Sequence, residues 1–185
     1  MGCGNGLSHV LFNYELLFFM EYDGKRVLLV GSGLDVNGRR LAAAVDGPRS
    51  RWDVVVRMNR HYGHPEDVGL RTDVIFTRWK RWLGWWSREA LEAVSDVVVL
   101  NEYMGFSAEE LALDCREVGH DAASIGLHTA AFLVRRGALV EGIGFGCAGG
   151  VFAREKRYPD GRRDGNLRYN WRAENEWLRR NITLL

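Results

Sequence analysis

Short apolar runs alternate along the chain with longer stretches that have the composition and spacing of helices. The apolar runs predict strands at residues 27–30, 53–58, 73–76, 96–100 and 140–145. The intervening segments predict helices at residues 10–21, 38–45, 87–94, 107–118, 126–136 and 171–180. A continuous apolar run such as 96–100 is typical of a parallel strand that is covered on both faces. The pattern therefore predicts an α/β fold, a Rossmann-like three-layer α/β/α architecture with a mostly parallel sheet.

Turn and capping residues divide these elements in the expected places. Gly47-Pro48 ends the second predicted helix, and Ser87 and Ser124 are candidate N-caps. Residues 159–161 (Pro-Asp-Gly) predict a turn inside a charged segment. There are no internal repeats and no linker, so we expect one domain over residues 1–185, with the glycine-rich residues 1–9 loosely held.

A glycine turn follows the first strand, and a polar residue follows the second. Gly31-Ser32-Gly33 lacks the third glycine of a dinucleotide-binding fingerprint, because Val36 occupies that position. The second strand ends in Asn59, at a position where NAD- and methyl-donor-binding proteins have an acidic residue that binds the ribose. An asparagine amide can instead donate a hydrogen bond to a phosphate or read a base edge. The missing third glycine and the asparagine at position 59 together disfavour a dinucleotide site. They are compatible with a different ligand at the carboxyl edge of the sheet.

Composition narrows the class of protein further. The net charge of +1 over 185 residues gives no overall field that would drive binding to DNA or a membrane. Three scattered cysteines fit a reduced, cytoplasmic compartment, and no Cys/His cluster has metal-ligand spacing. The apolar segment near residues 10–20 is too short, and too interrupted, to span a bilayer.

Two spaced signatures resemble the large motif of the sialyltransferases, glycosyltransferase family 29. One is Asp53-Val-Val-Val-Arg-Met-Asn59 after the glycine turn, and the other is Asp67-Val-Gly-Leu-Arg-Thr72. Residues 123–145 are similar to the small motif of the family, with Ser124-Ile125-Gly126, a helix, and then Gly-Phe after a strand. The segment from Tyr169 to Glu174 has the spacing of the last motif, with Tyr in place of the family's His.

The resemblance implies a variant GT-A-type transferase that binds a nucleotide sugar, of the CMP-sialic acid kind, without a metal or another cofactor. Carried over to this chain, the donor-binding residues are Gly31, Ser32, Gly33, Asn59, Ser124, Ile125 and Gly126. The start of the helix after Ser124 would offer free N–H groups and the positive end of the helix dipole to a phosphate.

Three residues are candidates for catalytic roles. Tyr169 replaces the histidine that serves as general base in the family, and Glu174 closes the same motif. His128 lies in the first turn of the small-motif helix, close to the expected phosphate, and could act as a base or pack in the core. His61 and His64, in the loop after Asn59, could contact an acceptor.

Residues 77–88 interleave tryptophan with Arg and Lys. One interpretation is an acceptor platform built from Trp79, Trp82 and Trp85 for a glycan, a lipid-linked sugar or a nucleic acid. Another is a helix that packs its tryptophans on the core, and a third is a membrane surface. The alternatives to a sialyltransferase-like enzyme are a nucleotide-binding protein of the same fold that lacks activity and a nucleic-acid-modifying transferase that uses this stretch.

Overall fold

The computed structural model describes residues 21–31, 38–59, 65–99, 107–145, 156–157, 163–164 and 169–185. Apart from Glu21, the helix predicted at residues 10–21 lies outside these ranges, and so do residues 1–9 and the turn at 159–161.

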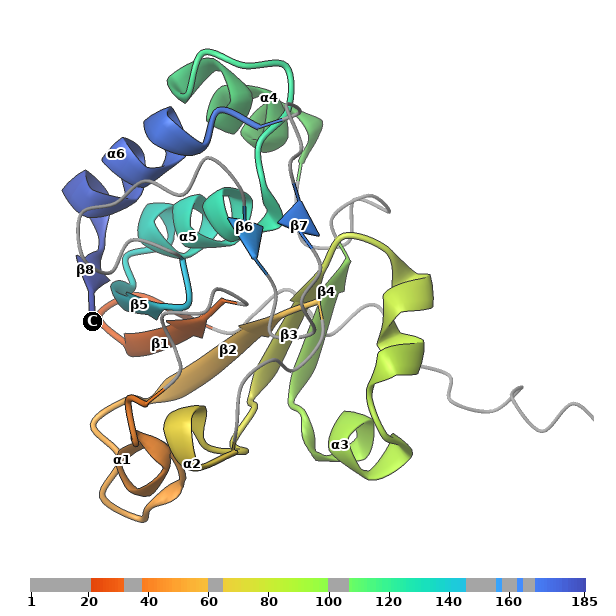
Figure 1. Cartoon of the computed structure of the whole chain (residues 1–185), viewed down its shortest axis with the longest axis vertical. Helices are drawn as coiled ribbons and strands as arrows, with labels where there is room; N and C mark the ends of the chain where they lie inside the picture. The colour runs from red at the N-terminus through yellow and green to blue at the C-terminus, as the bar shows by residue number, and fades with distance from the viewer. Residues whose placement is uncertain are drawn as a thin grey trace, which may run out of the picture.

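Six parallel strands form one sheet in the order β4-β3-β2-β1-β5-β8 (Figure 1). The strands are β1 (Arg26–Val30), β2 (Val54–Met58), β3 (Val74–Thr77), β4 (Asp96–Val99), β5 (Leu139–Ile143) and β8 (Thr183–Leu184). The chain builds outward from β1 to β4 and then returns to the other side of β1 with β5. The topological switch point therefore lies between β1 and β5, the position at which open α/β sheets bind ligands beyond the carboxyl ends of the strands.

Helices cover both faces of the sheet, so the predicted three-layer α/β/α fold is confirmed (Figure 1). One face carries α1 (Ala42–Asp46), α2 (Pro65–Val68), the 3-10 helix η2 (Lys80–Trp85) and α3 (Arg88–Ala93). The opposite face carries α4 (Ala108–Glu117), α5 (Ile125–Arg135) and α6 (Trp171–Asn181). No helix in the described ranges is both long and apolar enough to cross a bilayer.

The strands are mostly apolar because their alternating side chains fill apolar cores on both faces of the sheet. Leu29 and Val56 belong to the core under α4, α5 and α6, whereas Leu28 and Val55 belong to the core under α1 and α2. On the α5 side, the Phe132 ring packs edge to face against the ring of Phe76 in β3, with ring centroids 5.2 Å apart. Burial on both faces explains why the sequence pattern of these strands is continuous rather than alternating.

Serine caps begin three helices, and two of them are the predicted caps Ser87 and Ser124. Ser87 accepts a hydrogen bond from the Ala90 N–H, and Ser124 accepts one from the Leu127 N–H. Ser107 forms a full capping box at the start of α4. Each cap satisfies N–H groups that a helix start leaves without an intrahelical partner.

Several boundaries differ from the predictions. The helix expected at 38–45 begins only at Ala42, because Gly38 and Arg40 have φ angles of 77° and 51°, which no α-helix accommodates. The loop expected after Asn59 contains the short helix α2, and the tryptophan-rich stretch forms a 3-10 helix rather than an α-helix. The structure also adds β8, together with a small antiparallel ribbon of β6 (Lys156–Arg157) and β7 (Arg163–Asp164).

Candidate ligand site at the carboxyl edge of the sheet

The glycine of the turn after β1 packs directly against the end of β5. The Gly31 N–H donates to the Ile143 carbonyl oxygen at 2.7 Å, and a Cβ on Gly31 would clash with the Gly144 carbonyl. Gly144 has a φ of 84° and would itself bring a Cβ to 2.7 Å from the Gly31 carbonyl. Gly31 is thus required by the contact of two strand ends at the switch point, whatever ligand lies above it. Ser32 and Gly33 lie outside the described residues.

Asn59 ends β2 in the left-handed region, with a φ of 59°. Its N–H donates to the Phe76 carbonyl and its own carbonyl accepts from the Trp86 indole, so the backbone is held on both sides. The side-chain Oδ1 accepts from the Arg78 N–H at 3.3 Å. The Nδ2 amide group has no acceptor among the described residues, and it is available to a ligand.

Arg78, the first residue after β3, connects the separate parts of this edge. Its Nη2 donates to the Ala123 carbonyl at 2.7 Å, just before the cap of α5. Its guanidinium lies over the Tyr169 ring, 5.6 Å from the ring centroid. Through its backbone it also holds Asn59. Sequence reasoning did not assign Arg78 to the site, although its position directly after a strand was a signal for such a role.

The start of α5 is occupied in part by a buried carboxylate. Glu174 Oε1 accepts from the Ser124 N–H at 2.8 Å, and the Glu174 side chain is 1% exposed. Ser124 Oγ takes the Leu127 N–H. Within the described part of the chain, the N–H groups of Ile125 and Gly126 have no acceptor. Of the three predicted small-motif residues, two therefore keep a free N–H donor, whereas the Ser124 N–H is already bound.

Gly126 allows the aromatic ring of the Gly-Phe pair to approach the helix. A Cβ at Gly126 would lie 3.0 Å from Cε1 of Phe145, and a Cβ at Gly142 would lie 3.0 Å from its Cε2. The ring is therefore held between α5 and β5, next to the switch point. This contact explains physically why glycines accompany Phe145 in the segment that resembles the small motif.

Tyr169 and Glu174 flank the start of α6 and both face this edge of the sheet. The Tyr169 ring packs edge to face on Trp171, with centroids 5.1 Å apart, and lies under the Arg78 guanidinium. Glu174 binds the cap of α5. The structure thus brings the last-motif segment together with Asn59 and the small-motif segment.

His128 is buried between α4 and α5. Its Nδ1 lies 2.6 Å from Oδ2 of Asp114, and Oδ1 of the same carboxylate accepts from Arg135 at 2.6 Å. His128 is 4% exposed and Asp114 is fully buried. The carboxylate orients the imidazole and selects its tautomer. Such an arrangement serves a packed histidine as well as a general base, so the catalytic role of His128 stays a prediction.

Arg57, in the Arg-Met-Asn signature, holds the second signature in place. Its Nε donates to the Arg71 carbonyl and to Thr72 Oγ1, and its Nη2 donates to the carbonyls of Val68 and Gly69. The side chain is 1% exposed, and burial lowers its pKa to about 10. The two spaced signatures are therefore parts of one structural unit, in which Arg57 clasps the 67–72 loop from β2.

Asp46 completes this unit from α1. Its carboxylate accepts hydrogen bonds from the N–H groups of Leu70 and Arg71. Gly69 has a φ of 68°, and a Cβ there would clash with Asp46 Oδ1. The glycine of the Asp67–Thr72 signature is thus required both by its backbone conformation and by the approaching carboxylate.

The tryptophans of the 77–88 stretch have different environments. Trp86 packs against the apolar cluster of β3 and β4 and donates its indole N–H to the Asn59 carbonyl. Trp79 is 38% exposed and lies under the Arg81 guanidinium at 5.4 Å. Trp82 is half-buried, and the side chain of Trp85 lies outside the description. Trp86 therefore serves packing, whereas Trp79 is the tryptophan that presents an accessible ring.

The remaining predicted residues cannot be placed. His61 and His64 lie outside the described residues, so their acceptor role stays a prediction. Among the described residues there is no group of three His, Cys, Asp or Glu side chains that could hold a metal ion.

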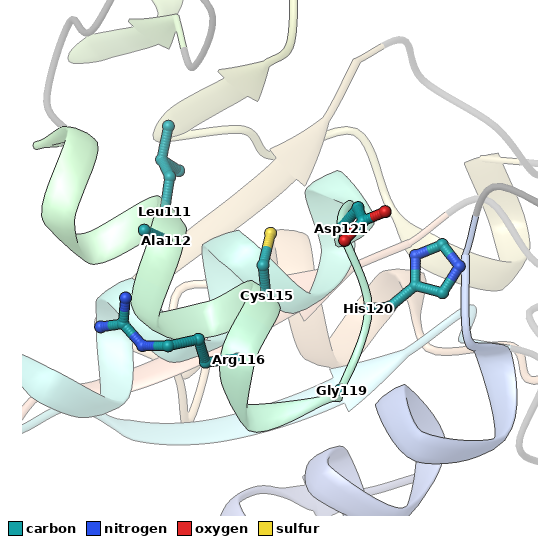
Figure 2. A pocket seen from close by; sticks show the side chains of 7 residues that line it. All are labelled: Leu111, Ala112, Cys115, Arg116, Gly119, His120 and Asp121. Atoms are coloured by element: carbon teal, nitrogen blue, oxygen red, sulfur yellow. The ribbon is translucent and has the colours of Figure 1, made fainter.

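A surface pocket lies on α4 and on the loop that leads from it towards Ser124 at the start of α5 (Figure 2). Its lining is formed by Leu111, Ala112, Cys115, Arg116, Gly119, His120 and Asp121. Burial raises the pKa of the Cys115 thiol, which keeps it protonated and weakly reactive at neutral pH. The pocket contains no residue that the sequence predicted for the site.

No model of a known protein family matches the sequence, and a search of curated proteins finds no significant match. The case for a function therefore rests on the residues themselves and on the geometry that joins them.

Proposed function

We propose that the protein is a metal-independent glycosyltransferase that takes a sugar from a nucleotide donor, of the CMP-sialic acid kind, and passes it to an acceptor hydroxyl. One observation carries the proposal. Residues from three distant segments of the sequence that resemble sialyltransferase motifs meet at one sheet edge, at Asn59, at Ser124–Gly126 and at Tyr169–Glu174.

In this proposal the donor lies across the carboxyl edge near the switch point. The Nδ2 amide of Asn59 and the N–H groups of Ile125 and Gly126 bind the phosphate and the adjoining ribose. These donors are fixed before the ligand arrives, because Asn59 is held by three hydrogen bonds and α5 is packed on the sheet. Preorganised donors of this kind stabilise developing negative charge without a metal.

The reaction breaks the bond between the anomeric carbon and the phosphate oxygen and forms a bond from that carbon to the acceptor oxygen. The phosphate leaves with the bonding electron pair as the nucleoside monophosphate. The proton of the acceptor hydroxyl passes to a general base. We assign this base to His128, because it lies in the first turn of α5, close to Ile125 and Gly126, and the Asp114 carboxylate beside its Nδ1 orients the ring.

A second candidate function is nucleotide binding without transfer. It is favoured by the fact that the candidate catalytic side chains already have structural partners. Glu174 binds the α5 cap, Tyr169 lies under Arg78, and His128 is buried against Asp114. A protein that keeps the groups that bind the nucleotide, and uses these three side chains only for packing, would bind a nucleotide sugar without cleaving it.

Calorimetry with CMP, UMP and their sugar conjugates tests the proposed class of ligand. We expect micromolar to millimolar binding of at least one nucleotide, lost in Asn59→Gly, which keeps the left-handed backbone. Failure of all these nucleotides to bind would overturn both candidate functions.

A donor hydrolysis and transfer assay then separates the two candidates. For an enzyme, His128→Gln should lower turnover by about 100-fold or more while CMP affinity changes little. Binding without measurable release of CMP from the donor would favour the second candidate.

A further inference from the structure

Arg78 has more hydrogen-bonding capacity than the fold uses. A guanidinium carries five N–H donors. In the described part of the chain only Nη2 has an acceptor, the Ala123 carbonyl. The side chain is half-buried, whereas Arg57 on the neighbouring strand is fully enclosed. A planar cation with spare donors at a sheet edge is suited to bind a phosphate in a bidentate manner.

The position of Arg78 matches the place where a negative charge would be held. Its guanidinium touches the carbonyl that precedes Ser124, so it lies beside the start of α5 with the free N–H groups of Ile125 and Gly126. Glu174 places a carboxylate at the same helix start. An anion can bind beside that carboxylate only where a cation offsets it, and no other Arg or Lys in the described ranges bonds to residues 123–126.

Tyr169 supports this cation. Its ring lies under the Arg78 guanidinium and is itself fixed edge to face against Trp171. A stacked aromatic ring attracts a guanidinium and restricts its orientation without consuming its in-plane N–H donors. The Tyr169 ring therefore restricts the plane of the Arg78 guanidinium and leaves its N–H donors available for hydrogen bonds.

We infer that Arg78 is the residue that binds the phosphate of the donor, and that Tyr169 is a positioning residue that seats Arg78 rather than a general base. The inference rests on the proposed function for the identity of the ligand and deepens it by naming the charge that holds the leaving group. The chemistry recognised is a phosphate monoester or diester at the carboxyl edge of β3.

The phenol oxygen and the aromatic ring of Tyr169 can be tested separately. A general base needs the oxygen, whereas a seat for Arg78 needs only the ring. Tyr169→Phe should therefore keep the CMP affinity within about twofold, and Tyr169→Leu should weaken it several-fold. If Tyr169→Phe keeps CMP binding but abolishes turnover, the positioning role without base chemistry is overturned.

Calorimetry with CMP, cytidine and inorganic phosphate tests Arg78 itself. We expect Arg78→Gln to lower CMP affinity by about ten- to hundred-fold while leaving cytidine binding unchanged, since a hydrogen bond to a charged group has a value in this range. Arg81→Gln is the matched control, because Arg81 is an exposed arginine of the same segment that lies over Trp79. It should change neither affinity.

The outcomes separate this inference from the proposed function. An Arg78→Gln protein that is folded and keeps the wild-type preference for CMP over cytidine would overturn the inference and leave the nucleotide site standing. Phosphate binding that is lost in Arg78→Gln, with no nucleotide bound, would support the inference and remove the proposed donor.

Absence of both CMP and phosphate binding in the wild-type protein would overturn both. If Arg78→Gln fails to fold, Arg78→Lys keeps the charge and removes the fork. A loss of CMP affinity in Arg78→Lys then supports the inference, and wild-type affinity overturns it.

Discussion

Arg57 and Arg78 lie near the carboxyl ends of neighbouring strands, yet the fold uses their guanidinium groups in opposite ways. Arg57 is 1% exposed and donates to four acceptors of the 68–72 loop. Arg78 is half-buried, donates to one carbonyl and stacks on one ring. Arg57 joins β2 to the 68–72 loop. Arg78 keeps N–H donors that no described residue accepts.

The difference teaches how to interpret the motif residues. Arg57 belongs to the more specific part of the sialyltransferase resemblance, yet its contacts are structural. Arg78 lies outside the quoted signatures, yet it touches the residues of the expected site. A signature can therefore mark the framework that supports a site, while the residue with free chemistry lies one strand away.

Breaking the Arg57 clasp should have the largest effect on stability. Arg57→Leu removes the donors to four acceptors of the 68–72 loop, two of them buried, and removes a cation near the Asp46 carboxylate. We expect a loss of about 3–5 kcal/mol in the free energy of unfolding, measured by urea denaturation. Arg78→Gln should lose less than about 1 kcal/mol. Equal losses at the two positions would erase the contrast between them.

The close approach of β1 and β5 gives the next largest effect. Gly31→Ala would place a methyl group against the Gly144 carbonyl, and we expect about 1–3 kcal/mol of destabilisation by the same measurement. Gly84→Ala is the control, since a Cβ there meets nothing within 4 Å and should change stability by about 0.5 kcal/mol or less. A Gly31→Ala protein as stable as the wild type would mean that this glycine is required by a ligand rather than by packing.

At Asn59, two substitutions separate the backbone from the amide. Both Asn59→Gly and Asn59→Ala remove the side-chain donor, but only Ala must adopt a φ of 59° against its Cβ. We expect the Ala variant to be about 1 kcal/mol less stable than the Gly variant, with the same loss of CMP affinity in both. Wild-type CMP affinity in the Gly variant would remove Asn59 from the site.

The smallest effect concerns Glu110, which pairs with Arg135 and Arg136 where α4 meets α5. Burial by itself raises the pKa of Glu110, but the Ser107 N–H and the charges of Arg136 and Arg135 outweigh it, so the pKa lies below its ordinary value. A lowered pKa in the folded state contributes stability above the unfolded-state pKa, and this contribution is lost as the pH falls through the folded-state pKa.

Glu110→Gln should therefore cost about 0.5–1 kcal/mol at pH 7 and almost nothing near pH 2, as followed by urea denaturation across this range. A cost that is the same at both pH values would show that the carboxylate charge has no part in the contact.

The sequence anticipated the sheet because its signals are local. The strand runs, the serine caps and the helix around His128 follow from apolar periodicity and from the hydrogen-bonding needs of helix starts. The late start of α1 was not predictable, because an arginine side chain gives no indication that its backbone adopts a left-handed conformation, as Arg40 does. The 3-10 form of η2 was missed because its tryptophans have the spacing of an α-helix.

By itself, the sequence determined the α/β order of elements and indicated that Gly31, Asn59 and Ser124 lie at strand ends or helix starts. Only the tertiary structure decided what these residues touch. It closed Gly31 on Gly144, put Glu174 on the Ser124 N–H, and joined Asn59 to Tyr169 through Arg78. The reason is physical: periodicity depends on neighbours a few residues away, whereas a site depends on contacts between strands and helices that lie far apart in the chain.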